Sequence, residues 1–314
     1  MNRLTALLAL GLLASRAAAQ PIGLEIEASR DVFLPGEPVQ VLVTIKNNSG
    51  RRLHFGDDPE WLKFRVTTGK NKPVDRLRPP AIEGEFDLDT GFSATRKVDL
   101  APAFDLMALG FYTATVTLRV GEFRVELTTP EPLKFELVRG FRLWEQDFGV
   151  PTAEGELPPA KAESRRYSVV QLRTTKGIRL YSRVSDAADV LPIKVMELGQ
   201  YFTFTPPETQ VDRTGFLHVL FQSHGRVFTY CVVSPDGDLL KRNSYDSNAS
   251  RPGLKLDKEA GIVVAGGKRL LAINDIPPVD ALSLPRELPP LPPEVLPVPA
   301  KDAKKPSAAS KPKK

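Results

Sequence analysis

Apolar and polar residues alternate along the first part of the chain. Between Ile22 and Arg139 the dominant period is two, which is typical of half-buried β-strands. The runs Val39–Lys46 and Tyr112–Val120 show this period most clearly, and turn-forming residues such as Pro35-Gly36 and Asn47-Asn48-Ser49-Gly50 separate such runs. Because roughly seven short strands with alternating faces are the pattern of two packed sheets, this stretch is predicted to form a β-sandwich.

Two short segments resemble immunoglobulin-like modules of secreted proteins. One is Val32–Val39, which carries a Pro-Gly-Glu turn before an alternating strand, and the other is Leu109-Gly110-Phe111-Tyr112. The second segment resembles a tyrosine corner, in which the tyrosine hydroxyl satisfies backbone groups where the chain crosses between the sheets. The paired cysteines of antibody domains are missing, so the resemblance is to the broader sandwich class. Proteinase-inhibitor-like and macroglobulin-like modules share the first segment. The resemblance implies a scaffold over residues 20–139 rather than an activity.

The alternating pattern breaks over residues 140–166, which are predicted to be a linker. Glu154–Glu163 is polar and contains prolines, as linkers do. Phe141, Trp144 and Phe148 precede it at helical spacing, which predicts a short helix or loop packed on the end of a domain. An aromatic patch that grips a ligand is the alternative.

Predicted strands resume over residues 167–276, where a leucine–glycine spacing repeats. Three times a leucine is followed by a glycine five positions later and then by an apolar strand; the pairs are Leu172 and Gly177, Leu220 and Gly225, and Leu256 and Gly261. The three glycines are 48 and 36 residues apart, and repeats of this length resemble β-propeller blades. Three repeats are fewer than closed propellers use, so a smaller open sheet or barrel is predicted, with a ring completed by partner chains as the alternative. The predicted fold class is all-β, with a sandwich followed by a second, repeat-containing β domain.

The N-terminal segment predicts export, and the C-terminal segment predicts a disordered tail. Residues 1–19 combine Arg3, an apolar run and the small residues Ala17-Ala18-Ala19, which is the pattern of a secretory signal peptide cleaved before Gln20. We therefore expect a secreted or periplasmic protein, and both ends are typical of bacterial proteins. No later segment is apolar for long enough to span a membrane. Residues 277–314 are rich in proline and then in lysine, which predicts a disordered tail.

Most of the positive charge lies in that tail. The chain carries a net charge of +5, and its last fourteen residues hold six lysines against one aspartate. The body between the leader and the last fourteen residues is slightly acidic, which argues against a nucleic-acid-binding surface on the folded domains. The tail lysines are predicted to contact an anionic polymer of the cell envelope. They are Lys301, Lys304, Lys305, Lys311, Lys313 and Lys314.

Few residues carry recognisable chemistry. Cys231 is the only cysteine and lies in an apolar run, so a buried and unreactive thiol is predicted. His54, His218 and His224 are interpreted as structural, because the sequence points to no further metal ligand or acid–base partner beside them. No catalytic residue, metal or cofactor is predicted.

Several loop motifs are interpreted as structural. Gly266-Gly267-Lys268-Arg269 matches a phosphate loop only in part, because Arg269 replaces the Ser or Thr that would reach magnesium. Ser234-Pro235-Asp236-Gly237-Asp238 partly resembles the Asp box of sialidase blades, but Asp-Gly favours tight hairpin turns by itself. The clusters Asp57-Asp58-Pro59-Glu60 and Asp87-Leu88-Asp89 are predicted to be solvated loop acids, with calcium binding as the alternative.

These observations together predict a non-enzymatic binding or structural protein that presents β-surfaces to a protein or polysaccharide partner. Two alternatives stay open. One is a secreted hydrolase with acidic residues in the second domain, which would need two carboxylates about 5–10 Å apart. The other is a proteinase inhibitor that acts through a loop of the first domain.

Removal of residues 301–314 tests the role of the tail. A flexible run of cations attracts polyanions over a distance that salt shortens, to about 8 Å at 0.15 M ionic strength. We expect a chain ending at Ala300 to lose most of its binding to isolated cell envelope at low salt in a sedimentation assay. Equal binding by the full and shortened chains would contradict this role and would leave the β domains as the binding surface.

Overall fold

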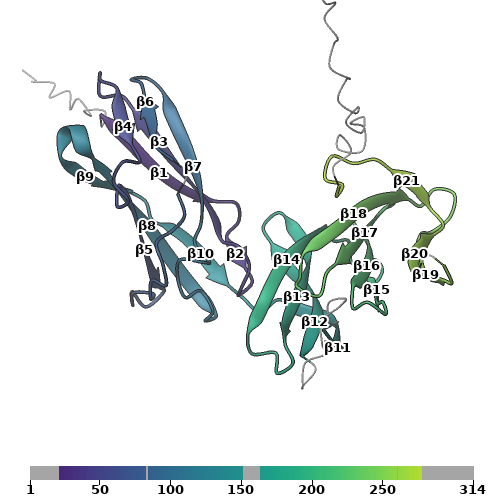
Figure 1. The fold of residues 1–314 in the computed structure, drawn as a ribbon. Helices are drawn as coiled ribbons and strands as arrows, with labels where there is room; N and C mark the ends of the chain where they lie inside the picture. The colour runs from purple at the N-terminus through teal and green to yellow at the C-terminus, as the bar shows by residue number, and fades with distance from the viewer. Residues whose placement is uncertain (1–20, 83, 151–162, 260, 278–314) are drawn as a thin grey trace, which may run out of the picture.

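The computed structural model describes residues 21–82, 84–150, 163–259 and 261–277. These residues form two all-β domains joined by a short stretch of chain (Figure 1), which confirms the predicted fold class. The predicted leader and the lysines of the tail lie outside the described residues. No helix within the described part is both long enough and apolar enough to cross a membrane.

Two sheets and a small ribbon make up the first domain. Its elements are β1 (Ile22–Ala28), β2 (Val32–Phe33), β3 (Gln40–Asn47), β4 (Leu53–Phe55), β5 (Leu62–Thr68), β6 (Phe86–Leu88), β7 (Ser93–Asp99), β8 (Gly110–Val120), the 3-10 helix η1 (Gly121–Phe123), β9 (Val125–Thr128) and β10 (Leu133–Leu137). One sheet has the strand order β1-β3-β7 and the other β2-β10-β8-β5, with β9 also paired to β8; β4 pairs with β6. The pairing is antiparallel except between β2 and β10.

The alternating apolar and polar residues of the sequence lie on the buried and the exposed faces of these strands. Along β8, alternate residues from Tyr112 to Val120 are buried, and the residues between them are at least partly exposed. The buried residues join those of the facing sheet in one core, where each large apolar side chain contributes about 1.5–3 kcal/mol. The Tyr112 hydroxyl donates to the Ala108 carbonyl oxygen at 2.6 Å, which is the backbone contact that the sequence predicts for a tyrosine corner.

The second domain stacks two sheets and adds a two-stranded ribbon. Its strands are β11 (Phe141–Gly149), β12 (Ser164–Thr174), β13 (Gly177–Asp186), β14 (Pro192–Gln200), β15 (Glu208–Val211), β16 (Leu217–Gln222), β17 (Val227–Val233), β18 (Leu239–Asp246), β19 (Gly253–Asp257), β20 (Gly261–Ala265) and β21 (Lys268–Leu270). One sheet has the order β11-β12-β13-β14 and the other β15-β16-β17-β18-β21. A core that includes Tyr167, Leu198 and Phe221 lies between these sheets. The β19–β20 ribbon packs over Phe228 and Tyr230.

The prediction of a linker over residues 140–166 is wrong at both ends of this range, where β11 and the start of β12 lie. Residues of β11 pair with β12, and only residues 151–162 of this stretch lie outside the described part. The helical spacing of Phe141, Trp144 and Phe148 arises from a β-bulge between Arg142 and Trp144, because a bulge adds one residue to a strand and reverses its alternation. Trp144 and Phe148 both follow the bulge, are an even number of residues apart and therefore pack on the same core.

Each of the three leucine–glycine repeats is a β-hairpin. The pairs are β12 with β13, β16 with β17, and β19 with β20, and each glycine lies in the turn or opens the second strand. The hairpins belong to three separate sheets. The described residues therefore form an open stack of sheets rather than a ring of blades.

A third apolar cluster joins the two domains, where β2 and β10 approach β14 (Figure 1). Leu34, in the turn after β2, packs with residues of β12, β13 and β14. Gly36 and Gly140 border this contact with φ values of 83° and 69°. A Cβ atom would lie 2.8 Å from Pro192 at Gly36 and 2.6 Å from Val170 at Gly140. Glycine is therefore required at both positions for the domains to approach this closely.

Replacement of Gly140 by alanine should loosen the junction. The added Cβ would clash with Val170 and Leu34, beyond the cost of about 1–2 kcal/mol for a left-handed residue. Gly50→Ala is the matched control, because Gly50 has a φ of +79° and open space around it. We expect Gly140→Ala to lower the free energy of unfolding by about 1–3 kcal/mol more than the control in denaturant titrations. Equal losses would show that this contact does not hold the junction.

Candidate functional site

A pocket of about 760 Å³ lies at the junction of the two domains. Its volume is in the range of ligand-binding pockets, which are common at domain interfaces. The first domain contributes Leu34, Pro35, Met107 and Leu109 to its lining, and the stretch that joins the domains contributes Arg139 to Arg142. The second domain contributes Arg166, Val170, Arg183, Ala188, Asp189, Val190 and Pro192.

Three neighbouring strands bring arginine side chains to this pocket. Residues two apart on a strand share one face, so Arg166, Ser168 and Val170 of β12 lie on the same side of the sheet. The register places Ser168 opposite Arg183 of β13, and Val170 opposite Arg142 of β11. Guanidinium groups from three strands therefore gather on the sheet face that meets the first domain.

Asp189 lies between two of these guanidinium groups. Arg142 and Arg183 each donate a hydrogen bond to one oxygen of its carboxylate, and the side chain is only 17% exposed. Burial acts to raise the pKa of Asp189, but the hydrogen bonds and charges of Arg183 and Arg142 outweigh it and lower the pKa below its ordinary value. Asp189 is therefore ionised at neutral pH.

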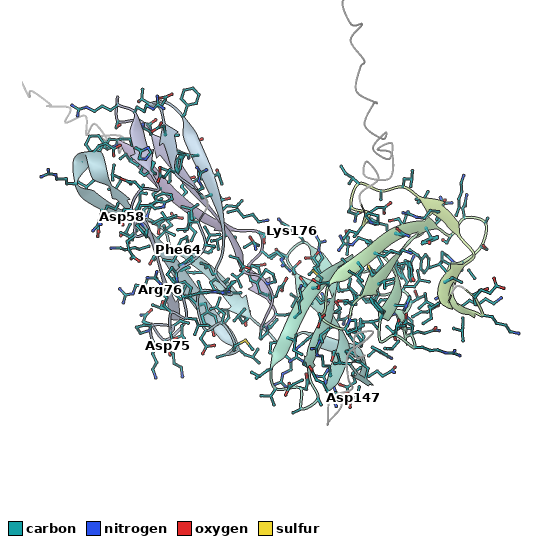
Figure 2. The ribbon with its side chains drawn as sticks, in the orientation of Figure 1. Asp58, Phe64, Asp75, Arg76, Asp147 and Lys176 are labelled. Atoms are coloured by element: carbon teal, nitrogen blue, oxygen red, sulfur yellow. The ribbon has the colours of Figure 1, made fainter. Side chains whose placement is uncertain are left out.

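The other two arginines differ in their partners. Arg166 donates two hydrogen bonds to Asp147, at 2.5 and 3.1 Å, and Figure 2 shows Asp147 at the lower end of the second domain. The side chain of Arg139 is exposed and has no ion pair or hydrogen bond within the described part of the chain. Asp189 and Glu145 pair with Arg142, Asp189 pairs with Arg183, and Asp147 pairs with Arg166, so the positive charge in excess among the lining residues is that of Arg139.

Exposed apolar side chains from both domains surround the arginines. Met107 and Leu109 are 39% and 51% exposed, and Phe141 and Val190 are 63% and 69% exposed. Single exposed apolar residues are common, but a group of them around one pocket is typical of an interaction site. This lining can accept a ligand that is anionic in one part and apolar in another.

His218 contacts two polar side chains in the second domain, which the sequence did not predict. Its ring nitrogens lie 2.7 Å from the Tyr230 hydroxyl and 3.1 Å from an Asp212 carboxylate oxygen, and the residue is buried. Asp212 also accepts hydrogen bonds from the backbone N–H groups of Thr214 and Phe216, so this buried chain of contacts anchors a turn. The partners of His218 could not be read from the sequence, since Tyr230 reaches it only through strand pairing.

The other candidate residues also make local contacts. His54 lies on the surface, with its Nδ1 atom 2.9 Å from an Asp87 carboxylate oxygen. The hydrogen bond with Asp87 is the largest cause of the raised pKa of His54. His224 lines a second pocket, beside the ring of Phe202. Asp58, in the other acidic cluster, pairs with Arg119 at 2.6 Å. Within the described residues, no three His, Cys, Asp or Glu side chains gather closely enough to hold a metal ion.

Two of the predicted turn motifs are confirmed. In the Asp-box-like segment the Gly237 N–H donates to the Ser234 carbonyl oxygen at 2.8 Å, which closes a tight turn. In the other motif the Gly267 N–H donates to the Ser250 hydroxyl at 3.0 Å. The predicted polyanion contacts, from Lys301 to Lys314, lie outside the described residues, so their role stays a prediction.

Comparisons with known proteins identify no family for this chain. No family model matches it, and no curated protein matches its sequence. Spo0M, a sporulation control protein from Bacillus subtilis, is 11% identical with a TM-score of 0.29, over 55% of this chain and 83% of that one. The periplasmic chaperone SfaE is 12% identical with a TM-score of 0.24, over 71% of this chain and 98% of that one.

A third similar structure is a family 123 glycoside hydrolase from Clostridium perfringens. It is 9% identical with a TM-score of 0.25, and the match covers 38% of this chain but only 27% of the hydrolase. At such TM-scores none of these likenesses carries an argument about function.

Cys231 should be unreactive in the folded protein. Burial raises the pKa of its thiol to about 12, although the charge of Arg242 acts in the opposite direction. We expect a disulfide reagent at pH 8 to label Cys231 after unfolding in guanidinium chloride but not before, because the thiolate is the reactive form. Rapid labelling of the native protein would contradict this burial and reopen a nucleophilic role.

Proposed function

We propose that this chain is an exported binding protein whose junction pocket holds an acidic, partly apolar segment of a partner protein. The observation that carries the proposal is the excess of arginine over carboxylate in a pocket bordered by exposed apolar side chains. On this proposal the immunoglobulin-like first domain and the β11–β14 sheet form the two sides of the binding pocket. The leader directs the protein to the periplasm or the exterior.

A polypeptide suits this lining better than a polysaccharide does. Guanidinium groups bind carboxylates in bidentate pairs, and arginine, phenylalanine and methionine are enriched at protein interfaces. A neutral sugar chain would leave Arg139 without a counter-charge and Met107 without an apolar contact. A segment that carries glutamate or aspartate beside leucine-like side chains satisfies both.

The same geometry favours binding over hydrolysis. Glycoside hydrolases use two carboxyl groups about 5–10 Å apart, one of which must donate a proton. The junction pocket is lined by one carboxylate, Asp189, and both of its oxygens accept hydrogen bonds from arginine. A carboxyl group whose pKa is lowered in this way is a poor proton donor.

Labelled peptides test the proposal. Fluorescein-labelled decapeptides made of Glu and Leu, of Lys and Leu, and of Ser and Leu differ in charge but share their apolar content. We expect the mature chain to bind the Glu–Leu peptide roughly tenfold more tightly than the other two in fluorescence anisotropy, with an affinity that falls as salt rises. Equal affinity for the three peptides would contradict the proposal.

Arg139→Ala links this binding to the pocket. Loss of an exposed guanidinium group with no internal partner should weaken binding of the Glu–Leu peptide roughly tenfold, because hydrogen bonds to charged groups are among the stronger ones. Arg213→Ala is the matched control, since Arg213 is an exposed arginine in the turn between β15 and β16. The control should leave the affinity unchanged.

A further inference from the structure

Asp189 reaches the pocket from a turn rather than from a strand. It lies between β13 and β14 with a φ of 60°, a left-handed conformation that is unfavourable for most residues. Its carboxylate accepts hydrogen bonds from Arg142, from Arg183 and, at 3.1 Å, from the Ser185 hydroxyl. Contacts with the two arginines therefore help to hold this turn against the pocket.

Ser168 carries a buried hydroxyl that has no hydrogen-bond partner among the described residues. The residue is 0% exposed, lies between the pocket residues Arg166 and Val170 on β12, and pairs with Arg183 on β13. Buried hydroxyls in folded proteins nearly always have a partner, so an exception calls for an explanation. An oxygen atom held by the neighbouring guanidinium groups would accept the hydrogen bond of Ser168.

We infer that a carboxylate of the partner replaces that of Asp189 on Arg142 and Arg183 and lies closer to the strand, within reach of the Ser168 hydroxyl that Asp189 does not contact. This inference rests on the proposed function and adds which atoms of the partner are recognised and which residue competes with them. In the unbound protein Asp189 pairs with both guanidinium groups, and Glu145 also pairs with Arg142. The partner's carboxylate displaces that of Asp189, and the turn that carries Val190 moves away from the pocket.

An internal competitor makes the pocket selective. Asp189 is tethered beside the arginines, so its effective concentration is high and a small free carboxylate competes poorly. A peptide whose apolar side chains also cover Met107 and Leu109 gains the burial that a lone carboxylate lacks. The pocket therefore recognises a carboxylate next to an apolar side chain rather than negative charge alone.

Asp189→Asn tests whether the aspartate competes with the ligand. Asparagine tolerates a left-handed backbone and keeps an acceptor oxygen, so the turn is retained while the negative charge is lost. We expect this variant to bind the fluorescein-labelled Glu–Leu decapeptide roughly tenfold more tightly than the unchanged mature chain. Asp238→Asn is the matched control, because it removes the same charge from an exposed aspartate paired with Lys194, outside the pocket. It should alter the affinity by less than about twofold.

The outcomes separate the inference from the proposed function. If the unchanged chain prefers the Glu–Leu over the Lys–Leu peptide and Asp189→Asn binds it equally or more weakly, the inference is overturned and the proposed function stands. If neither chain shows that preference, both are overturned.

Ser168→Ala provides a second test that also applies if Asp189→Asn does not fold, as judged by circular dichroism. Loss of the hydroxyl should weaken binding of the Glu–Leu peptide about fivefold without lowering the unfolding midpoint, because no internal hydrogen bond is removed. Unchanged binding by Ser168→Ala would overturn the inference.

Discussion

Arg30 links the two domains on whose arrangement the pocket depends, because it pairs with Glu37 in the first domain and contacts the second domain. The two side chains are 15% and 3% exposed, and Arg30 also donates to the hydroxyl of Tyr181 and lies 3.6 Å from Glu197 in the second domain. Glu37 accepts a hydrogen bond from the Leu34 N–H at 3.0 Å, which shapes the turn that enters the junction. Removal of Arg30 would leave the buried Glu37 carboxylate without its ion-pair partner, at a cost of about 3–5 kcal/mol.

Charge and packing act on the same turn of the first domain. Burial raises the pKa of Glu37, whereas the charge of Arg30 and the N–H of Leu34 act to lower it. Leu34 also belongs to the apolar cluster with Tyr181 and Val195, and it lines the pocket. The shape of the pocket is therefore a consequence of how this turn docks on the second domain. Strands hold the arginines rigidly, while the competing carboxylate sits on a turn.

Local patterns along the chain predict most of the strands and several turns. The alternation in Tyr112–Val120 becomes β8, and the glycines of the three repeats lie at hairpins. Two of them, Gly177 and Gly261, have the positive φ that tight turns favour. The tyrosine corner at Tyr112 is also readable, since its hydroxyl bonds only four residues back. The same reasoning fails in β11, because the bulge after Arg142 reverses the alternation on which it depends.

The sequence by itself determined the all-β class, the turns and the apolar surroundings of Cys231, because each depends on residues that are close together along the chain. The tertiary structure alone decided where the pocket lies. Arg142, Arg166 and Arg183 belong to three different strands, and each by itself is typical of an ordinary polar strand position. Strand register brings them onto one face, and docking of the first domain closes the pocket over them. The bulge in β11 shifts its register against β12, and docking of the first domain is set by long-range packing, so the alternation of apolar and polar residues predicts neither.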